Sequence, residues 1–138
     1  MKYLGLDLGS RTLGIATSDG TGLIASTYKT IRHNEEYDRL LLEVKEIIEE
    51  LKIDEVVLGF PKNMNNTIGP KGELSLEFKE KLEKLVTVPV HLQDERLTTK
   101  SATDMLIMGN VSRKDRKKVV DSVAATIILQ TFLDRKRN

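Results

Sequence analysis

The stretch Lys2–Asp19, KYLGLDLGSRTLGIATSD, decides the fold of this chain. It predicts a short strand that ends at Asp7, followed by a tight turn through Gly9 and Ser10. A second strand follows over Thr12–Thr17. Apolar residues on both sides indicate that each strand is buried on at least one face. An ionised carboxylate inside such a run is costly unless something compensates its charge, which marks Asp7 as a candidate functional residue.

Glycines surround this acid in the sequence. Because glycine has no Cβ, we expect Gly5 and Gly9 to leave backbone space beside Asp7 for a cation or a phosphate group. In the second strand, Leu13 and Ile15 are predicted to lie in the core.

Length and composition bound the class of protein. The chain has 138 residues, enough for one domain and too few for two, so a single domain over 1–138 is predicted. Hydrophobic residues make up 39% and charged residues 31%, as is usual for a globular protein. The absence of cysteine excludes a disulfide framework and a thiolate metal site. Without a signal sequence or an apolar run near the roughly 20 residues of a membrane span, we expect a cytoplasmic protein with no membrane partner.

The charge balance is close to neutral. Lys and Arg number 22 against 21 Asp and Glu, and this net charge of +1 neither requires nor excludes a nucleic-acid partner. The basic residues are uneven, however, with a cluster at 113–118 and a basic tail at 135–137. Each group is either a solvated helix end or a nucleic-acid contact, and the sequence leaves both open.

The rest of the chain alternates strands and helices. A third strand over Leu23–Ile31 should return beside the second after a turn at Asp19–Gly20. The further predicted elements are a helix capped by Asn34, a strand Val56–Phe60, a loop Pro61–Gly72, a helix marked by Leu74 and Leu82, a strand Val86–Leu92, a helix capped by Thr98 or Thr99, and a last helix from a capping box at Ser112 to about Leu133. This order predicts an α/β fold with one mixed five-stranded sheet, antiparallel in its first three strands and then parallel, with helices on both faces.

The last predicted helix carries the second candidate acid. Apolar residues cover nearly its whole circumference, so it should be buried on most sides. Asp121 lies in the middle of this surface, and the small pair Ala124–Ala125 would let the helix sit close to the sheet. Asp121 is therefore a candidate site residue. The alternative is a structural ion pair with a basic residue such as Arg116 or Lys117.

A third acid is expected where the last predicted strand ends, because ligands gather beyond the carboxyl ends of parallel strands. Asp94 and Glu95 both fall there, and Asp7 lies near the end of the first strand. Side chains at a strand end alternate between faces, so only one of the two acids can point at the site. Periodicity alone does not choose between them.

Together these acids indicate a metal site. Three carboxylates brought close would repel each other unless a cation neutralised them. Oxygen ligands favour Mg²⁺ or Mn²⁺ over Zn²⁺, and His33 and His91 lack the spacing of a ligand pair. Two such ions can activate a water and stabilise the leaving oxygen of a phosphodiester. Ser10 and Ser18 have no histidine partner in view, which argues against a serine hydrolase.

Four segments, in this order and over nearly the whole chain, resemble the YqgF (RuvX) family. They are LGLDLGSRTLGIATSD (4–19), LGFPKNMNNTIGPKG (58–72), HLQDERLTT (91–99) and VDSVAATIILQTFL (120–133). The resemblance implies a ribonuclease H-like fold and a metal-dependent nuclease that processes the 5′ end of pre-16S rRNA in ribosome biogenesis. It also implies an alternative activity, as a Holliday junction resolvase.

The resemblance also implies the site residues. The acidic triad of the family falls on Asp7, Glu95 and Asp121, which selects Glu95 over Asp94. These three residues are expected to be catalytic and to bind two Mg²⁺ or Mn²⁺ ions. Lys62, Asn63 and Arg96 lie in the matching motifs and are expected to contact the substrate. Arg113 and Lys114 are expected contacts as well, from the basic cluster at 113–118. Phosphate contacts of this kind would give salt-sensitive, sequence-independent affinity.

Alternative functions remain open at this point. A resolvase makes paired cuts in a four-way DNA junction and needs a dimer, whereas pre-rRNA processing is compatible with a monomer or a weak homodimer. DLGSRTLG (7–14) also resembles the phosphate loop of sugar kinases and actin-like ATPases, which suggests a nucleotide-binding domain. Those proteins close two domains over a nucleotide, and one is predicted here. A non-catalytic RNA-binding module would not require a buried Asp121.

Overall fold

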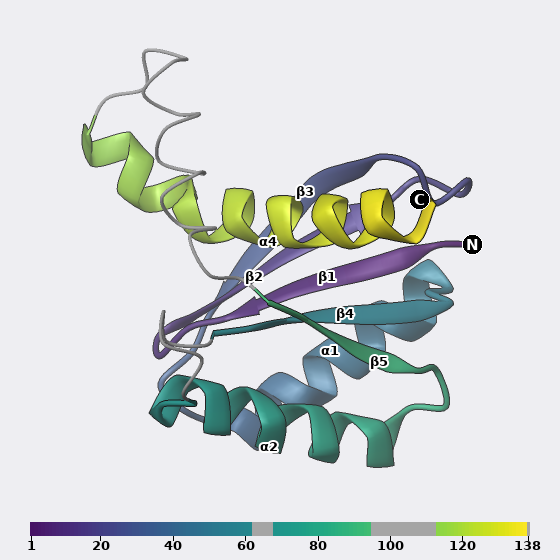
Figure 1. The fold of residues 1–138 in the computed structure, drawn as a ribbon. Helices are drawn as coiled ribbons and strands as arrows, with labels where there is room; N and C mark the ends of the chain where they lie inside the picture. Colours follow the sequence, from purple (N-terminus) through teal and green to yellow (C-terminus); the bar gives the residue numbers. More distant parts are fainter. Residues whose placement is uncertain (62–67, 95–112, 138) are drawn as a thin grey trace.

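The computed structural model describes residues 1–61, 68–94 and 113–137, with the side chains of 113–122 and 137 left out. The elements are β1 (Tyr3–Leu8), β2 (Thr12–Ser18), β3 (Ala25–Arg32), α1 (Tyr37–Leu51), β4 (Glu55–Phe60), α2 (Pro70–Leu85), β5 (Val90–Asp94) and α4 (Arg113–Arg137). The strands form one sheet in the order β3-β2-β1-β4-β5. Helices α1 and α2 cover one face of it and α4 covers the other (Figure 1). We call these the α1/α2 face and the α4 face.

The sheet is mixed, as predicted. Strands β1 and β2, and β2 and β3, pair antiparallel, whereas β1, β4 and β5 pair parallel. Two antiparallel steps bring β3 back to the direction of β1. The carboxyl ends of β1, β3, β4 and β5 therefore lie along the same side of the sheet, which we call the carboxyl edge.

Each face of the sheet has its own core. On the α1/α2 face, Leu4, Leu6 and Leu8 of β1 join the buried apolar side of α1. On the α4 face, Tyr3 of β1 packs with Leu129 and other buried residues of α4. Because side chains alternate along a strand, Gly5 and Asp7 belong to the α4 face with Tyr3.

Helix α4 approaches β1 closely at Gly5. A Cβ added to Gly5 would lie 2.8 Å from the Cβ of Leu129 and 3.1 Å from the carbonyl oxygen of Ala125. The expectation that Gly5 leaves space for a cation or a phosphate is therefore wrong, because the helix fills that space. The expectation that the Ala124–Ala125 pair lets the helix sit close to the sheet is confirmed.

Polar contacts hold α4 against the edge strand β3. The Gln130 side chain accepts a hydrogen bond from the Ala25 amide at 2.9 Å and donates one to the Leu23 carbonyl at 3.0 Å. The hydroxyls of Thr126 and Thr27 lie 3.0 Å apart. Thr126 and Gln130 of α4 are half-buried, in agreement with a helix buried on most of its sides.

A buried acid anchors the carboxyl-terminal end of α4. The Glu55 side chain, which is 11% exposed, accepts hydrogen bonds from His91 Nε2 at 2.9 Å and from Lys136 Nζ at 3.0 Å. Lys136 also donates to the Tyr3 hydroxyl at 2.7 Å, and the His91 ring stacks on Phe132. Burial alone would raise the pKa of Glu55, but hydrogen bonds from His91, Lys136 and Tyr3 outweigh it and hold the pKa below its ordinary value. This cluster ties α4 to β1, β4 and β5 at the end opposite the carboxyl edge.

Helix α1 begins later than predicted. Its N-terminal boundary residue is Glu36 and no side chain caps it, so Asn34 is not the N-cap. Glu35 has a φ of +63°, and its amide donates to His33 Nδ1 at 3.1 Å. The chain therefore makes a left-handed turn at Glu35 before the helix starts, which the sequence pattern did not show.

The second crossover also differs in its bounds. Pro70–Gly72 form the first turn of α2, so the predicted loop Pro61–Gly72 is shorter at its end. Strand β5 begins at Val90 instead of Val86, which is the C-terminal boundary residue of α2. Pro89 precedes the strand, and β5 lies at the sheet edge, as its presence suggested.

Two predicted features of the region between β5 and α4 are not tested by the structure. The helix predicted from Thr98 or Thr99 and the cap at Ser112 lie outside the described residues. No helix in the described part of the chain is long and apolar enough to cross a membrane.

Candidate functional site

Asp7 occupies the carboxyl edge on the α4 face. It is the penultimate residue of β1, and it is half-buried. On one side, Asp7 pairs with Gly14 of β2. On the other side, Leu6 pairs with Leu58 of β4, so Asp7 lies next to Gly59. Cross-strand neighbours on one face normally cover each other with their side chains. Asp7 has a glycine on each side, so no side chain from β2 or β4 covers its carboxylate at that level.

The backbone brings residue 121 to the same level. Helix α4 runs antiparallel to β1, since Leu129 lies over Gly5 while Lys136 reaches Tyr3 (Figure 1). From Ala125 back to position 121 the helix rises about 6 Å. From Gly5 forward to Asp7 the strand advances about 6.6 Å in the same direction. The helical turn that contains Asp121 therefore passes Asp7.

Helical spacing agrees with this placement. Positions 121, 125 and 129 are four residues apart and share one stripe of α4. Ala125 and Leu129 on that stripe are both 0% exposed against the sheet. The side chain of Asp121 is outside the described residues, so its contacts remain a prediction.

The register of β5 separates the two acids that periodicity could not. Asp94 pairs with Phe60, whose ring would lie 3.5 Å from a Cβ on Gly72 in the first turn of α2. Leu92, which has the same alternation as Asp94, packs into the core of the α1/α2 face. Asp94 therefore belongs to the face opposite Asp7. Glu95 is outside the described residues, and it stays the predicted third acid.

One polar residue of the site was missed from the sequence. Gln93 alternates with Asp94, pairs with Gly59, and is 6% exposed on the α4 face. It therefore lies on the same side as Asp7, across Gly59. Its amide nitrogen donates to the carbonyl of Asp94 in a long contact of 3.4 Å. A polar residue at a core position of HLQDE was the signal that could have found it.

The predicted substrate contacts lie mostly beyond the described residues. Lys62, Asn63 and Arg96 are outside them. Arg113 and Lys114 form the first turn of α4, whose amino-terminal turns extend past the carboxyl edge (Figure 1). Among the side chains that the structure describes, no group of three or more His, Cys, Asp and Glu lies close enough to hold a metal ion. The structure thus fixes Asp7 and the backbone around it, while the complete triad remains a prediction.

The sequence profile of the family described as "RuvX: Holliday junction resolvase" matches residues 1–135. The chain belongs to this family. A relative from Bacillus subtilis (strain 168) is 54% identical over 135 residues, which cover 97% of this chain and 98% of the relative. A relative from Geobacillus kaustophilus (strain HTA426) is 50% identical over 138 residues, which cover 99% and 100%. Both carry the name "Putative pre-16S rRNA nuclease".

Solved structures show the fold of the RuvX chain. T. thermophilus RuvC in complex with a Holliday junction substrate aligns with a TM-score of 0.63 and 17% identity, covering 100% of this chain and 97% of that one. The fowlpox virus Holliday junction resolvase aligns with a TM-score of 0.58 and 12% identity, covering 98% and 99%. The predicted ribonuclease H-like fold and the predicted family are both confirmed.

Proposed function

We propose that this RuvX-family protein is a metal-dependent endonuclease that hydrolyses phosphodiester bonds, with the 5′ end of pre-16S rRNA as its substrate in the cytoplasm. The observation that carries the proposal is Asp7 itself. It is a half-buried carboxylate at the carboxyl edge, with glycines on both neighbouring strands. The turn of α4 that bears residue 121 passes this carboxylate. The names of relatives at about half identity over the whole chain support the rRNA substrate.

The proposed site consists of Asp7, Asp121 and Glu95. Oxygen donors of this kind suit Mg²⁺ or Mn²⁺, and the side-chain-free positions beside Asp7 leave its carboxylate accessible to an ion. When bound, two such ions supply an activated water and stabilise the leaving oxygen. Two of the three acids belong to regular elements, since Asp7 lies in a central strand and Asp121 lies in a helix anchored at its far end by Glu55. Rigid placement matters since small misalignments of catalytic groups are costly.

The proposed substrate contacts are four basic residues and one asparagine. We propose that Lys62, Asn63, Arg96, Arg113 and Lys114 contact the nucleic-acid backbone. The first turns of α4 extend past the carboxyl edge, which is where a strand crossing Asp7 would continue. Cations there would add salt-sensitive affinity without reading sequence.

A Holliday junction resolvase is the second candidate. The family description favours it, whereas the likeness to the RuvC–junction complex, at 17% identity, shows the fold alone. A resolvase needs two sites in a dimer, whereas we propose a monomer or weak homodimer. Family membership over residues 1–135 favours either nuclease over a nucleotide-binding ATPase-like domain.

Cleavage assays distinguish the pre-16S rRNA nuclease from the Holliday junction resolvase. The purified protein would be incubated with a pre-16S RNA leader and, separately, with a four-way DNA junction, in Mg²⁺, Mn²⁺ or EDTA. We expect metal-dependent cutting of the RNA that Asp121→Asn abolishes. Paired cuts across the junction by a dimeric protein would instead assign the resolvase. Cutting by Asp121→Asn at the wild-type rate would contradict the proposed triad.

A further inference from the structure

A basic pocket lies at the carboxyl edge beside the β1–β2 turn. Arg11, Arg32, His33 and Asn34 line an open cavity of about 390 Å³ there. Arg11 belongs to the turn that follows β1, and Arg32 is the last residue of β3. None of the four residues is acidic, so the pocket combines two guanidinium groups with uncharged hydrogen-bonding side chains.

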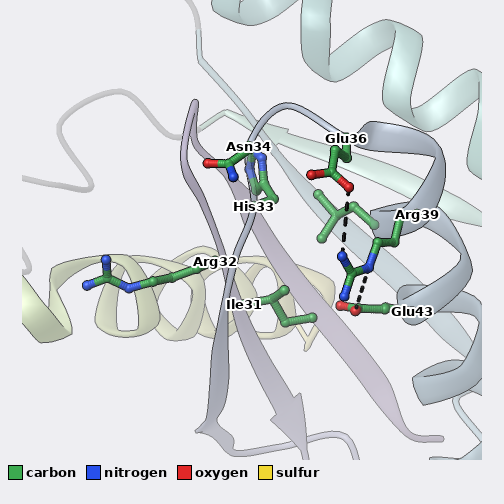
Figure 2. A pocket seen from close by; sticks show the side chains of 8 residues that line it. Ile31, Arg32, His33, Asn34, Glu36, Arg39 and Glu43 are labelled. Atoms are coloured by element: carbon green, nitrogen blue, oxygen red, sulfur yellow. Dashed lines mark ion pairs between the residues drawn. The ribbon is translucent and has the colours of Figure 1, made fainter.

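The two arginines of the pocket are unpaired. Within the described part of the chain, neither Arg11 nor Arg32 makes a side-chain ion pair or hydrogen bond. Arg39, close by on α1, is different, since it pairs with Glu36 at 3.7 Å and with Glu43 at 3.8 Å. Figure 2 shows both ion pairs of Arg39 and shows the Arg32 side chain extending away from them, on the other side of β3. Two neighbouring guanidinium groups that lack a counter-charge attract an anion with several acceptor oxygens.

A histidine fixes the geometry of the pocket. His33 Nε2 donates to the carbonyl of Gly9 at 3.0 Å, and the His33 amide donates to the carbonyl of Arg11 at 2.9 Å. Its Nδ1 accepts from the Glu35 amide at 3.1 Å. Nε2 and the backbone amide of His33 therefore hold the β1–β2 turn against the end of β3, while the contact at Nδ1 orients the ring. The two arginines project from segments clamped together, which reduces the ordering cost of binding a shared anion.

Arg32 of the pocket lies on the same face of the sheet as Asp7. Asp7 pairs with Gly14, which pairs with Thr30, and Arg32 is two residues further along β3. Ile31, with the opposite alternation, packs into the core of the α1/α2 face, so Arg32 belongs to the α4 face. Two strand spacings across and two residues along place the Cα atoms of Asp7 and Arg32 about 12 Å apart. That span covers a few phosphates of a nucleic-acid strand, whose charges recur roughly every 3.4 Å along a duplex axis.

We propose that the Arg11–Arg32 pocket binds a backbone phosphate of the nucleic-acid strand being cut, a few nucleotides from the bond held at Asp7. This inference rests on the proposed nuclease function and extends it to the β3 side of the site. The strand would then run between this pocket and the amino-terminal turns of α4, with Asp7 between them.

Binding measurements without metal test the pocket separately from cleavage. Fluorescence anisotropy of a labelled pre-16S leader RNA in EDTA would be followed for wild type, Arg11→Gln, Arg32→Gln and the double variant between about 50 and 200 mM salt. Each substitution should lower the slope of log K against log salt by about 0.7 to 0.9. At about 0.1 M salt this corresponds to roughly 5- to 8-fold weaker binding per arginine. Both side chains are exposed, so the variants should keep the wild-type melting temperature.

Arg39→Gln is the matched control, because it removes the same charge from a neighbouring arginine that already has acidic partners. It should leave the affinity and the salt slope unchanged. If the wild-type protein cuts RNA and the double variant binds RNA as tightly as wild type, the proposed phosphate pocket is wrong. The proposed nuclease function would not be affected by that result. Equal weakening by Arg39→Gln would overturn the phosphate pocket as well, because net charge would then be the cause. A wild-type protein that neither binds nor cuts nucleic acid would contradict both proposals.

Discussion

The close approach of α4 to β1 makes Gly5→Ala an informative perturbation. The added Cβ would lie 2.8 Å from the Leu129 Cβ and 3.1 Å from the Ala125 carbonyl oxygen. Carbon atoms in contact are normally about 3.5–4.0 Å apart, so the helix must retreat by about 1 Å. Neither neighbour can move away by a simple rotation, because one is a Cβ and the other belongs to the backbone.

The cost of this change can be estimated. Overpacking of this kind costs about 1–3 kcal/mol, and the loss of chain entropy in the unfolded alanine variant offsets about 0.4–1 kcal/mol of it. A net loss of about 1–2 kcal/mol should lower the melting temperature of a domain of this size by roughly 3–10 °C. Cleavage should fall further, because the helix that retreats carries Asp121. A displacement of about 1 Å at a catalytic group can cost on the order of 100-fold in rate.

Thermal unfolding and RNA cleavage by the same preparations measure both effects. Gly20→Ala is the control, since a Cβ there would meet no described atom within 4 Å. It should leave the melting temperature and the cleavage rate unchanged. A Gly5→Ala protein with wild-type stability and wild-type rate would refute the packing argument and the role given to α4.

Three further predictions concern acids of this chain. Because the pKa of Glu55 is held below its ordinary value, its ionised form stabilises the fold fully above about pH 4.3 and less as the pH falls through the folded-state pKa. Glu55→Gln should therefore lower the free energy of unfolding by about 1.5–3 kcal/mol at pH 7. The difference in melting temperature between this variant and wild type should shrink below about pH 4. A difference that does not change with pH would contradict the role of ionised Glu55 in holding α4. Asp94→Asn should leave the cleavage rate within a few-fold of wild type while Glu95→Gln abolishes cleavage, and the reverse result would contradict the assignment of faces. Asp7→Asn should abolish cleavage while its melting temperature in EDTA stays equal to wild type or rises, because a like charge is removed from the site; unfolding of this variant, followed by circular dichroism, would show instead that Asp7 is structural.

Local patterns were sufficient for most of the elements. Alternation and apolar runs located β1, β2 and β4, and the helical spacing of Leu40 and Val44 located α1. The start of α1 was misplaced because Glu35 adopts a left-handed conformation, which is uncommon for a residue with a side chain. The Glu35 amide bonds to the ring of His33, two residues earlier, and that ring is held by the Gly9 carbonyl, a residue far away in the sequence. Local propensity does not predict this turn.

The faces of the sheet required the three-dimensional register. Gly5 in β1, and Gly14 and Gly59 on the two strands beside Asp7, each lie between apolar residues in the sequence. The sequence therefore could not distinguish their roles. The structure shows that a helix packs on Gly5, while the other two lie beside Asp7 in neighbouring strands. Periodicity did not separate Asp94 from Glu95, and the choice of Glu95 came from the family resemblance. The pairing of Asp94 with Phe60 places Asp94 on the face opposite Asp7.

Asp7 could be proposed as a candidate from the sequence because an ionised carboxylate in an apolar strand is costly unless its charge is compensated. The Arg11–Arg32 pocket was not predictable, since its two arginines are far apart in sequence and meet only through the pairing of β2 with β3.

Metal binding tests the proposed role of Asp7 in a divalent metal site without any choice of substrate. Mn²⁺ binding would be measured by calorimetry and by electron paramagnetic resonance for wild type, Asp7→Asn and Asp38→Asn. Asp38 is an exposed acid in the first turn of α1, on the other face of the sheet, and serves as the charge-matched control. We expect wild type and Asp38→Asn to bind Mn²⁺ alike and Asp7→Asn to bind it at least about 10-fold more weakly. Equal Mn²⁺ binding by Asp7→Asn and wild type would contradict a metal site at Asp7.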